Sequence, residues 1–415
     1  MPLTLEENEL LTQVGPGTPG GALLRRYWYP VAVAQELSAE QPTKFVRLLG
    51  EDLVLFRDTS GRVGLLADHC AHRGASLCYG RVEERGISCA YHGWLFDTDG
   101  NILETPPERN DAIMRHVKQP AYPVQRFIGM YWAYLGPQPA PLIPRYDVWV
   151  RPGGRRRIII WPRLDCNWFQ VMENSVDPAH AQILHQEHIG RGRKPVNTTR
   201  GFTDDVKGFE FYVNAFGIVK RRTYVNGQVD EHPLIFPNIL RAGPRTEIRV
   251  PMDDTHTWHL TVAFEPIADE LGGEEAEPLV QYIPPFKEPA NDLPPRAQFL
   301  PAADIARHHP AATAQQAELR EVLRLTQVMA QDYTMWETQG AIADRTTEHL
   351  SYSDTGVALL RRVLRDNIAR VQQGLDPLGV IRDPEHRMID TNMLDEGQGV
   401  RSTPPSGIRT ATVPA

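Results

Sequence analysis

Short apolar segments and turn-forming residues alternate along the first third of the chain, and this pattern predicts a domain made of β strands. From about residue 43 the apolar segments are only four to seven residues long, and Asp, Gly, Ser and Thr separate them. Strands are expected at 45–49, 53–56, 63–66 and 129–135. The Pro-rich stretch 137–144 follows the last of these strands and predicts a linker.

The second part of the chain combines long polar and apolar alternations with helical periodicity. A strand at 157–161 precedes alternations at 208–223, 233–242, 246–252 and 256–265, which are typical of an antiparallel sheet. Helices are predicted at 5–13, 313–340 and 353–374. The fold class that follows is α+β, with a β-rich domain ahead of a mixed domain.

These patterns divide the 415 residues into four parts. We expect an N-terminal helical arm at 1–40, a β-rich domain at 41–144, an α+β domain at 145–396 and a C-terminal tail at 397–415. A hydrophobic content of 41% and a charged content of 23% are ordinary for a globular protein. The formal net charge of −8 comes with no basic stripe, which argues against a nucleic-acid partner.

The location of the protein is also suggested by its sequence. Residues 1–7 are acidic and lack an apolar core, unlike a secretory signal. No apolar run approaches the length that spans a bilayer, so no membrane association is expected. A cytoplasmic protein is the interpretation that fits both observations.

Two short motifs in the β-rich domain offer thiolate and imidazole ligands. One contains Cys70 and His72, and the other contains Cys89 and His92. Zinc accepts two Cys and two His, and so does a Rieske [2Fe–2S] centre, in which two Cys hold one iron and two His hold the other. A zinc finger groups its two Cys in one half-site and its two His in the other. Because each motif here mixes the two residue types, the order favours the Rieske centre.

The sequence at this point resembles the Rieske domain of bacterial ring-hydroxylating oxygenases. It differs from the respiratory type, which has an additional disulfide-forming Cys in each loop. Ala75 and Tyr91 occupy those places here. A cluster without that disulfide is expected in a reducing compartment.

A second group of candidate ligands opens the α+β domain. Asp177 and Pro178 are typical of a helix N-cap and first helical position. His180 and His185 are five residues apart, which is about 140° of rotation on an ideal helix and too wide for adjacent ligands. Both can bind one metal ion only if the helix loosens, so His188 remains a rival for His185.

The resemblance extends to this second group. An Asp-x-x-His-x-x-x-x-His motif after a Rieske domain is the arrangement of oxygenase α subunits, and it matches Asp177, His180 and His185. The resemblance implies a mononuclear Fe(II) held by a 2-His-1-carboxylate triad, which leaves metal positions open for O₂ and substrate.

The third ligand is expected on the helix predicted at 313–340. Asp332 lies on the apolar face of that helix, where a carboxylate needs a partner. A metal is one such partner, and a buried Arg is the alternative. Glu337 and Asp344 are competitors for the ligand position, although Glu337 lies off the apolar stripe.

Within the family, the chain is most similar to the phthalate-dioxygenase-like group, which consists of α subunits only. This resemblance implies a Rieske domain followed by a helix-grip-like α+β catalytic domain. It also implies homotrimers or stacked trimers, in which the cluster of one subunit passes electrons to the iron of the next subunit. Asp177 would then be the catalytic carboxylate that bridges a cluster histidine and an iron histidine.

The expected activity is oxygenation of an aromatic substrate with O₂. No GxGxxG fingerprint appears, so a separate NAD(P)H-dependent reductase is the expected electron source. The substrate would be an aromatic carboxylate or an aryl ether, and the reaction a dihydroxylation, a monohydroxylation or an O-dealkylation. Arg241 and Arg245 are candidates for binding a carboxylate, or else ordinary sheet-edge charges. The alternatives are a Rieske-type electron carrier without oxygenase activity and a zinc-binding structural protein.

Overall fold

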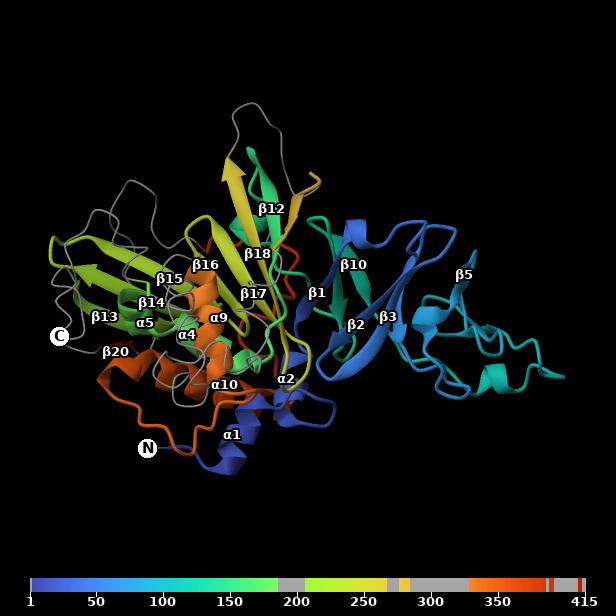
Figure 1. Cartoon of the computed structure of the whole chain (residues 1–415), viewed down its shortest axis with the longest axis horizontal. Helices are drawn as coiled ribbons and strands as arrows, with labels where there is room; N and C mark the ends of the chain where they lie inside the picture. The colour runs from blue at the N-terminus through green and yellow to red at the C-terminus, as the bar shows by residue number, and fades with distance from the viewer. Residues whose placement is uncertain are drawn as a thin grey trace, which may run out of the picture.

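The computed structural model of the chain describes residues 2–185, 206–266, 276–283, 328–385, 388–391 and 410–412. Figure 1 shows a β-rich domain, built mainly from the first third of the chain, beside a larger domain that combines a sheet with helices. The α+β organisation predicted from the sequence is confirmed. His188 and residues 313–327 lie outside the described residues.

Three small antiparallel sheets form the β-rich domain. The first has the order β1-β11-β10, with β1 at Trp28–Val33, β10 at Val124–Phe127 and β11 at Met130–Tyr134. The second, β2-β3-β4-β9, comprises Thr43–Leu48, Glu51–Arg57, Val63–Ala67 and Ala121–Tyr122. The third, β5-β6-β7-β8, comprises Arg81–Glu83, Gly86–Ser88, Leu95–Phe96 and Ile102–Glu104. Strand β1 lies within the stretch that we expected to be a helical arm.

A nine-stranded sheet forms the centre of the larger domain. Its order is β19-β12-β18-β17-β16-β15-β14-β13-β20. The strands run at Gly154–Ile160 (β12), Val206–Val213 (β13), Gly217–Tyr224 (β14), Val229–Ile235 (β15), Ile239–Ala242 (β16), Arg245–Pro251 (β17), Thr257–Pro266 (β18), Leu279–Tyr282 (β19) and Thr410–Thr412 (β20). The predicted alternations thus correspond to β13–β18. The described residues of the C-terminal tail form β20, which pairs with β13.

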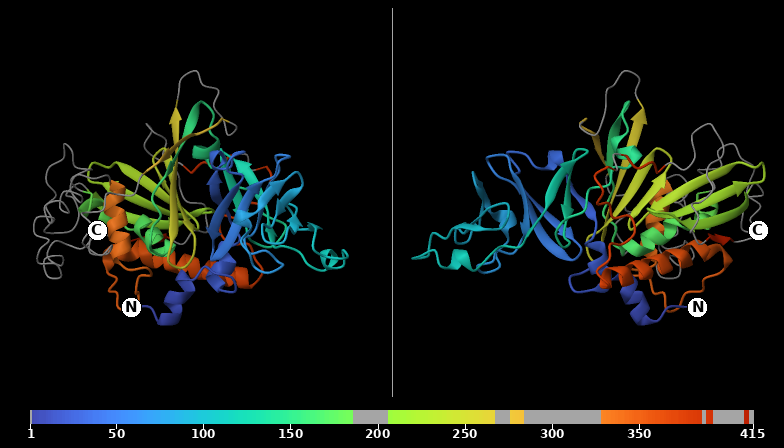
Figure 2. Two further views of the ribbon diagram at one scale, coloured as in Figure 1. Left: turned by 45° about the vertical axis from the view of Figure 1, so that its right-hand side comes forward. Right: turned by 180° about the vertical axis from the view of Figure 1, so that it is seen from behind.

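Helices of the larger domain gather along the sheet (Figures 1 and 2). They are α3 (Asp147–Val150), α4 (Trp168–Ser175), α5 (Pro178–Ile183), α9 (Val328–Thr338) and α10 (Thr355–Gln372). The N-terminal segment adds α1 (Leu5–Thr12) and α2 (Pro19–Leu24). Helix α1 begins at a capping box, in which Thr4 and Glu7 exchange side-chain to backbone hydrogen bonds. None of the helices in the described part of the chain has the length and apolar character needed to span a bilayer.

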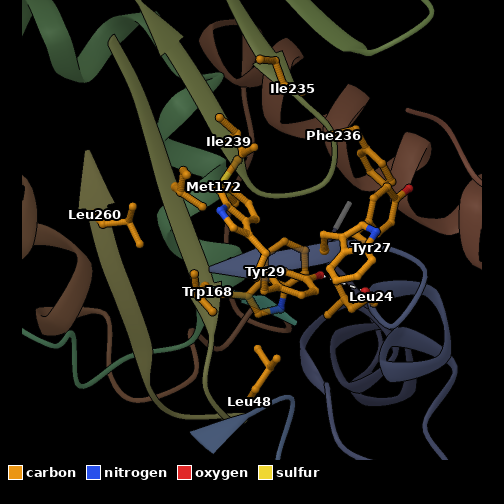
Figure 3. Packing of buried hydrophobic residues seen from close by; sticks show 14 of the residues in the cluster. Leu24, Tyr27, Tyr29, Leu48, Trp168, Met172, Ile235, Phe236, Ile239 and Leu260 are labelled. Carbon is orange, nitrogen blue, oxygen red and sulfur yellow. Dashed lines mark hydrogen bonds between the residues drawn. The ribbon is translucent and has the colours of Figure 1, made fainter. Parts of the chain in front are cut away.

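One hydrophobic core runs through both domains. Trp168 and Met172 of α4 belong to the same buried cluster as Leu260 of β18 and Tyr29 of β1 (Figure 3). Burying a large apolar side chain contributes about 1.5–3 kcal/mol each, so this shared core holds the β-rich domain firmly against the sheet. The Pro-rich stretch between the domains is fixed as well, because Pro141 accepts a hydrogen bond from Trp28 Nε1 at 2.8 Å.

Candidate metal centres

Two turns of the same shape carry the Cys and His residues of the first motif pair. Cys70 follows β4, and Cys89 follows β6. The Cys70 carbonyl accepts a hydrogen bond from the amide of Gly74 at 2.8 Å, and the Cys89 carbonyl accepts one from the amide of Gly93 at 2.8 Å. The two glycines have φ values of 74° and 73°, a left-handed conformation that suits glycine. Each turn therefore presents one Cys at its start and one His within it, two residues later in the first turn and three residues later in the second.

The four side chains of these turns meet in one place. The His72 and His92 ring centroids are 4.5 Å apart, and both Cys side chains are buried. Burial, together with the neighbouring Cys89 thiol, raises the pKa of Cys70 to about 11. The buried Nδ1 atom of His72 has no hydrogen-bond partner among the described residues. Paired thiols beside an unpartnered imidazole nitrogen fit a [2Fe–2S] cluster, because the metal deprotonates the thiols and accepts the nitrogen lone pair.

Helix α5 positions the histidines of the second group by ending early. Asp177 caps the helix, since its Oδ1 accepts a hydrogen bond from the Ala179 amide at 2.7 Å. The helix stops at Ile183, so His185 lies in the turn that follows and is not held at the wide angle that a continuous helix would impose. The spacing of His180 and His185 required an interruption of the helix, and the end of α5 provides it. The two ring centroids are 5.5 Å apart.

Asp332 of α9 completes this group. Its Oδ1 lies 3.1 Å from His185 Nε2 and 3.9 Å from His180 Nε2. One ligand atom from each of the three residues lies within 4.8 Å of the others. Two imidazoles and one carboxylate that converge in this way form a donor set suited to Fe(II) with open positions. The competing carboxylates are elsewhere: Glu337 accepts the Asp165 amide at 3.0 Å, and Asp344 is exposed.

A second residue of α9 fixes the ring of His185. Gln331 Oε1 lies 2.7 Å from His185 Nδ1. An amide oxygen only accepts, so Nδ1 carries a proton toward Gln331, and Nε2 is the ring nitrogen left to bind a metal ion. Burial lowers the pKa of His185, but the hydrogen bond to Asp332 outweighs it and leaves the pKa above its ordinary value. Gln331 was not among the expected site residues, although it directly precedes Asp332 in the chain.

Asp177 lies on the far side of the His180 ring. Its Oδ2 is 3.4 Å from His180 Nδ1, while the other ring nitrogen of His180 points toward Asp332. Burial raises the pKa of Asp177, and the interaction with His180 more than offsets this, so the pKa lies below its usual value. Asp177 is therefore ionised at neutral pH and contacts an imidazole of the triad without joining it.

The two arginines considered for carboxylate binding each pair with a carboxylate of the chain. Arg241 is buried, and its guanidinium pairs with Asp147 of α3 at 2.8 Å. Arg245 is half exposed and pairs with Glu247 at 3.3 Å. Sequence reasoning missed Asn174, whose Nδ2 lies 3.5 Å from Asp332 Oδ1. It also missed the buried Lys220 of β14, which directly follows the apolar residues Ile218 and Val219.

Two family models match separate parts of the chain. Residues 27–123 match the family described as the Rieske [2Fe-2S] domain, and residues 231–392 match the family described as LigXa C-terminal domain like. The chain is 36% identical over 395 residues to the 5,5'-dehydrodivanillate O-demethylase oxygenase subunit of a Sphingobium species, covering 92% of this chain and 84% of the relative. It is 34% identical over 404 residues to the phthalate 4,5-dioxygenase oxygenase subunit of Pseudomonas putida, covering 91% and 89%.

A solved structure shares the fold. NdmA of Pseudomonas putida CBB5 matches with a TM-score of 0.57 at 20% sequence identity, over 88% of this chain and 99% of that one. The sequence relatives are oxygenase subunits aligned over most of their length, so the alternatives of a bare electron carrier and of a structural zinc protein are wrong. The chain belongs to the Rieske non-haem iron oxygenases, as an oxygenase α subunit with a Rieske [2Fe–2S] domain.

Proposed function

We propose that this subunit receives electrons from a separate NAD(P)H-dependent reductase and uses O₂ to oxidise an aromatic carboxylate or an aryl ether. The cluster ligands would be Cys70, His72, Cys89 and His92. The mononuclear iron ligands would be His180, His185 and Asp332. The observation that carries the proposal is the convergence of these last three side chains within 4.8 Å, in a chain that also has a Rieske domain.

The named substrates of the two relatives support the substrate class. Phthalate and 5,5'-dehydrodivanillate are both aromatic dicarboxylates, although one relative is named a dioxygenase and the other an O-demethylase. An aromatic ring with a carboxylate is thus common to two different reactions. We infer the same kind of substrate here, with hydroxylation, dihydroxylation or O-demethylation as the reaction.

The side chains around the proposed iron have separable tasks. When bound, the cluster and the Fe(II) supply one-electron storage and O₂ activation. Gln331 holds the proton of His185 on Nδ1, which keeps the Nε2 lone pair available. Asp177 orients His180 through its Nδ1 atom and can hold or release a proton there. We assign Asp177 the coupling of the two centres, because a carboxylate on an iron histidine can also accept a hydrogen bond from a cluster histidine.

That coupling would operate between subunits. The third sheet of the β-rich domain and helix α5 lie at opposite ends of the molecule (Figures 1 and 2). A cluster in this position passes electrons to the iron of a neighbouring copy more readily than to the iron of its own chain, which supports a homotrimer or stacked trimers. All four cysteines are free thiols, which is in keeping with a cytoplasmic protein.

The test is turnover with product identification. Purified protein, a reductase, NADH and O₂ would be incubated with aromatic acids, including phthalate and methoxybenzoates. We expect a product that contains oxygen from labelled O₂, or formaldehyde together with a free phenol in the case of O-demethylation. Replacing Asp332 with Ala should abolish product formation while the visible spectrum of the cluster stays unchanged. Undiminished turnover in that variant would overturn the assignment of the iron site.

A further inference from the structure

Lys220 lies on the face of the sheet that is turned toward the proposed iron site. Its direct cross-strand neighbour is His232 of β15, and paired residues of an antiparallel sheet point to the same face. Arg249 and His259 are a corresponding pair on β17 and β18. The Lys220 ammonium interacts electrostatically with Asp177 and Asp332, and the Arg249 guanidinium interacts with Asp332.

Among the described residues, the arginines on this face contact carboxylates, and Lys220 contacts none. Arg222 forms an ion pair with Asp230, and Arg249 contacts Glu247 at 2.8 Å. Within the described part of the chain, Lys220 has neither a hydrogen bond nor an ion pair, although its exposed fraction is only 8%. A buried charge without a partner is costly, and burial lowers the pKa of Lys220 to about 8. The side chain is still mainly charged at neutral pH.

Among the described residues, this face carries more positive than negative charge. Asp177 and Asp332 together balance a bound Fe(II), Asp230 balances Arg222, and Glu247 is shared by Arg249 and Arg245. The ammonium of Lys220 then remains as a surplus positive charge in a buried place. An anionic group on the substrate would neutralise it and would be held on the same side of the sheet as the metal ligands.

We propose that Lys220 binds the carboxylate of an aromatic acid beside the iron and thereby selects the substrate class. The inference rests on the proposed function, which it makes more specific. Lys220 would act in binding and orientation, and it takes no part in the redox chemistry. The competing explanation is that Lys220 only balances the charge of Asp177.

The experiment measures binding without turnover. Calorimetry would be performed without O₂ and without reductase, using 3-methoxybenzoate and its neutral counterpart 3-methoxybenzamide. Replacing Lys220 with Met removes a charge-assisted hydrogen bond, so carboxylate binding should weaken about 10- to 100-fold. Amide binding should change by less than about threefold, because the amide does not need the positive charge. Lys220→Arg should retain most of the preference for the carboxylate.

A matched control is Lys207→Met, since Lys207 is an exposed lysine on the neighbouring strand β13. It should bind both ligands with the affinity of the parent protein. Equal weakening of carboxylate and amide in Lys220→Met, or no weakening of either, would overturn the inference. If Lys220→Met does not fold, or does not bind the mononuclear iron, Lys220→Gln provides the same comparison with a polar side chain. Because binding is measured without turnover, a failure of the oxygenation proposal would be seen separately.

Discussion

A buried ionic network ties helix α4 to the C-terminal part of the catalytic domain, and it provides a quantitative test of the structure. Glu173 of α4 accepts hydrogen bonds from Arg345 Nε at 3.0 Å and from Arg361 Nε at 2.7 Å. The exposed fractions of these two arginines are 1% and 3%. Helix α4 leads directly into α5, so this network also supports the segment that carries Asp177 and His180.

Glu173→Gln should destabilise the catalytic domain strongly. Removing one member of a buried ion pair costs about 3–5 kcal/mol, because the remaining charge stays buried without compensation. Arg361 keeps Glu348 as a second partner, so we expect the lower end, about 3 kcal/mol. For a domain of this size, that corresponds to a fall in Tm of roughly 10 °C.

Glu265→Gln is the matched control. Glu265 also pairs with two arginines, Arg155 and Arg157, but these side chains are about one-third exposed. Surface ion pairs contribute at most about 1 kcal/mol, so the Tm should change by no more than about 3 °C. Thermal unfolding followed by tryptophan fluorescence would compare the two variants. Equal Tm shifts in Glu173→Gln and Glu265→Gln would show that burial does not make the Glu173 network more stabilising than the exposed one.

Three further predictions concern the site itself. Asp177→Asn keeps the helix cap, so the protein should fold with both metal centres, while reoxidation of the reduced cluster should slow by orders of magnitude. If the cluster of the variant is reoxidised at the parental rate after rapid mixing with substrate and O₂, Asp177 does not couple the two centres. Gln331→Leu leaves His185 Nδ1 without its partner and should weaken iron binding about 10- to 100-fold in competition with a chelator. Burial, with help from Lys220, lowers the pKa of His232 to about 4, whereas the unfolded value is about 6.5. Between these two pKa values the unfolded chain binds more protons than the folded protein, so the free energy of unfolding should fall as pH decreases, by at most about 1.4 kcal/mol per pH unit. Urea unfolding at several pH values should show a weaker dependence of the unfolding free energy on pH in His232→Gln than in the parent protein.

The sequence was most informative where ligands are close together along the chain. Cys70 and His72 share one turn, and Asp177 and His180 share one turn of helix, so local spacing was enough to group them. The order of Cys and His identified the type of cluster, because that order is a property of the chain itself. Alternating strands were also predicted well, since a half-buried strand must alternate.

Cross-strand and interdomain contacts were beyond the sequence patterns. Arg241 and Asp147 are 94 residues apart, and no local pattern indicates that they form a pair. The role proposed for Lys220 depends on the register of β14 against β15, and a shift of one residue would turn it to the other face. Strand β1 was missed because its partner β11 is about a hundred residues further along.

We propose that one chain holds both a Rieske cluster and a separate mononuclear iron at His180, His185 and Asp332. Iron and acid-labile sulfide, measured on anaerobically purified protein and on Asp332→Ala, test it most directly. The parent protein should contain about three irons and two sulfides per chain. Asp332→Ala should lose about one iron and keep both sulfides and the visible spectrum. Zinc without sulfide would exclude the Rieske cluster, and an unchanged iron content in Asp332→Ala would exclude Asp332 as an iron ligand.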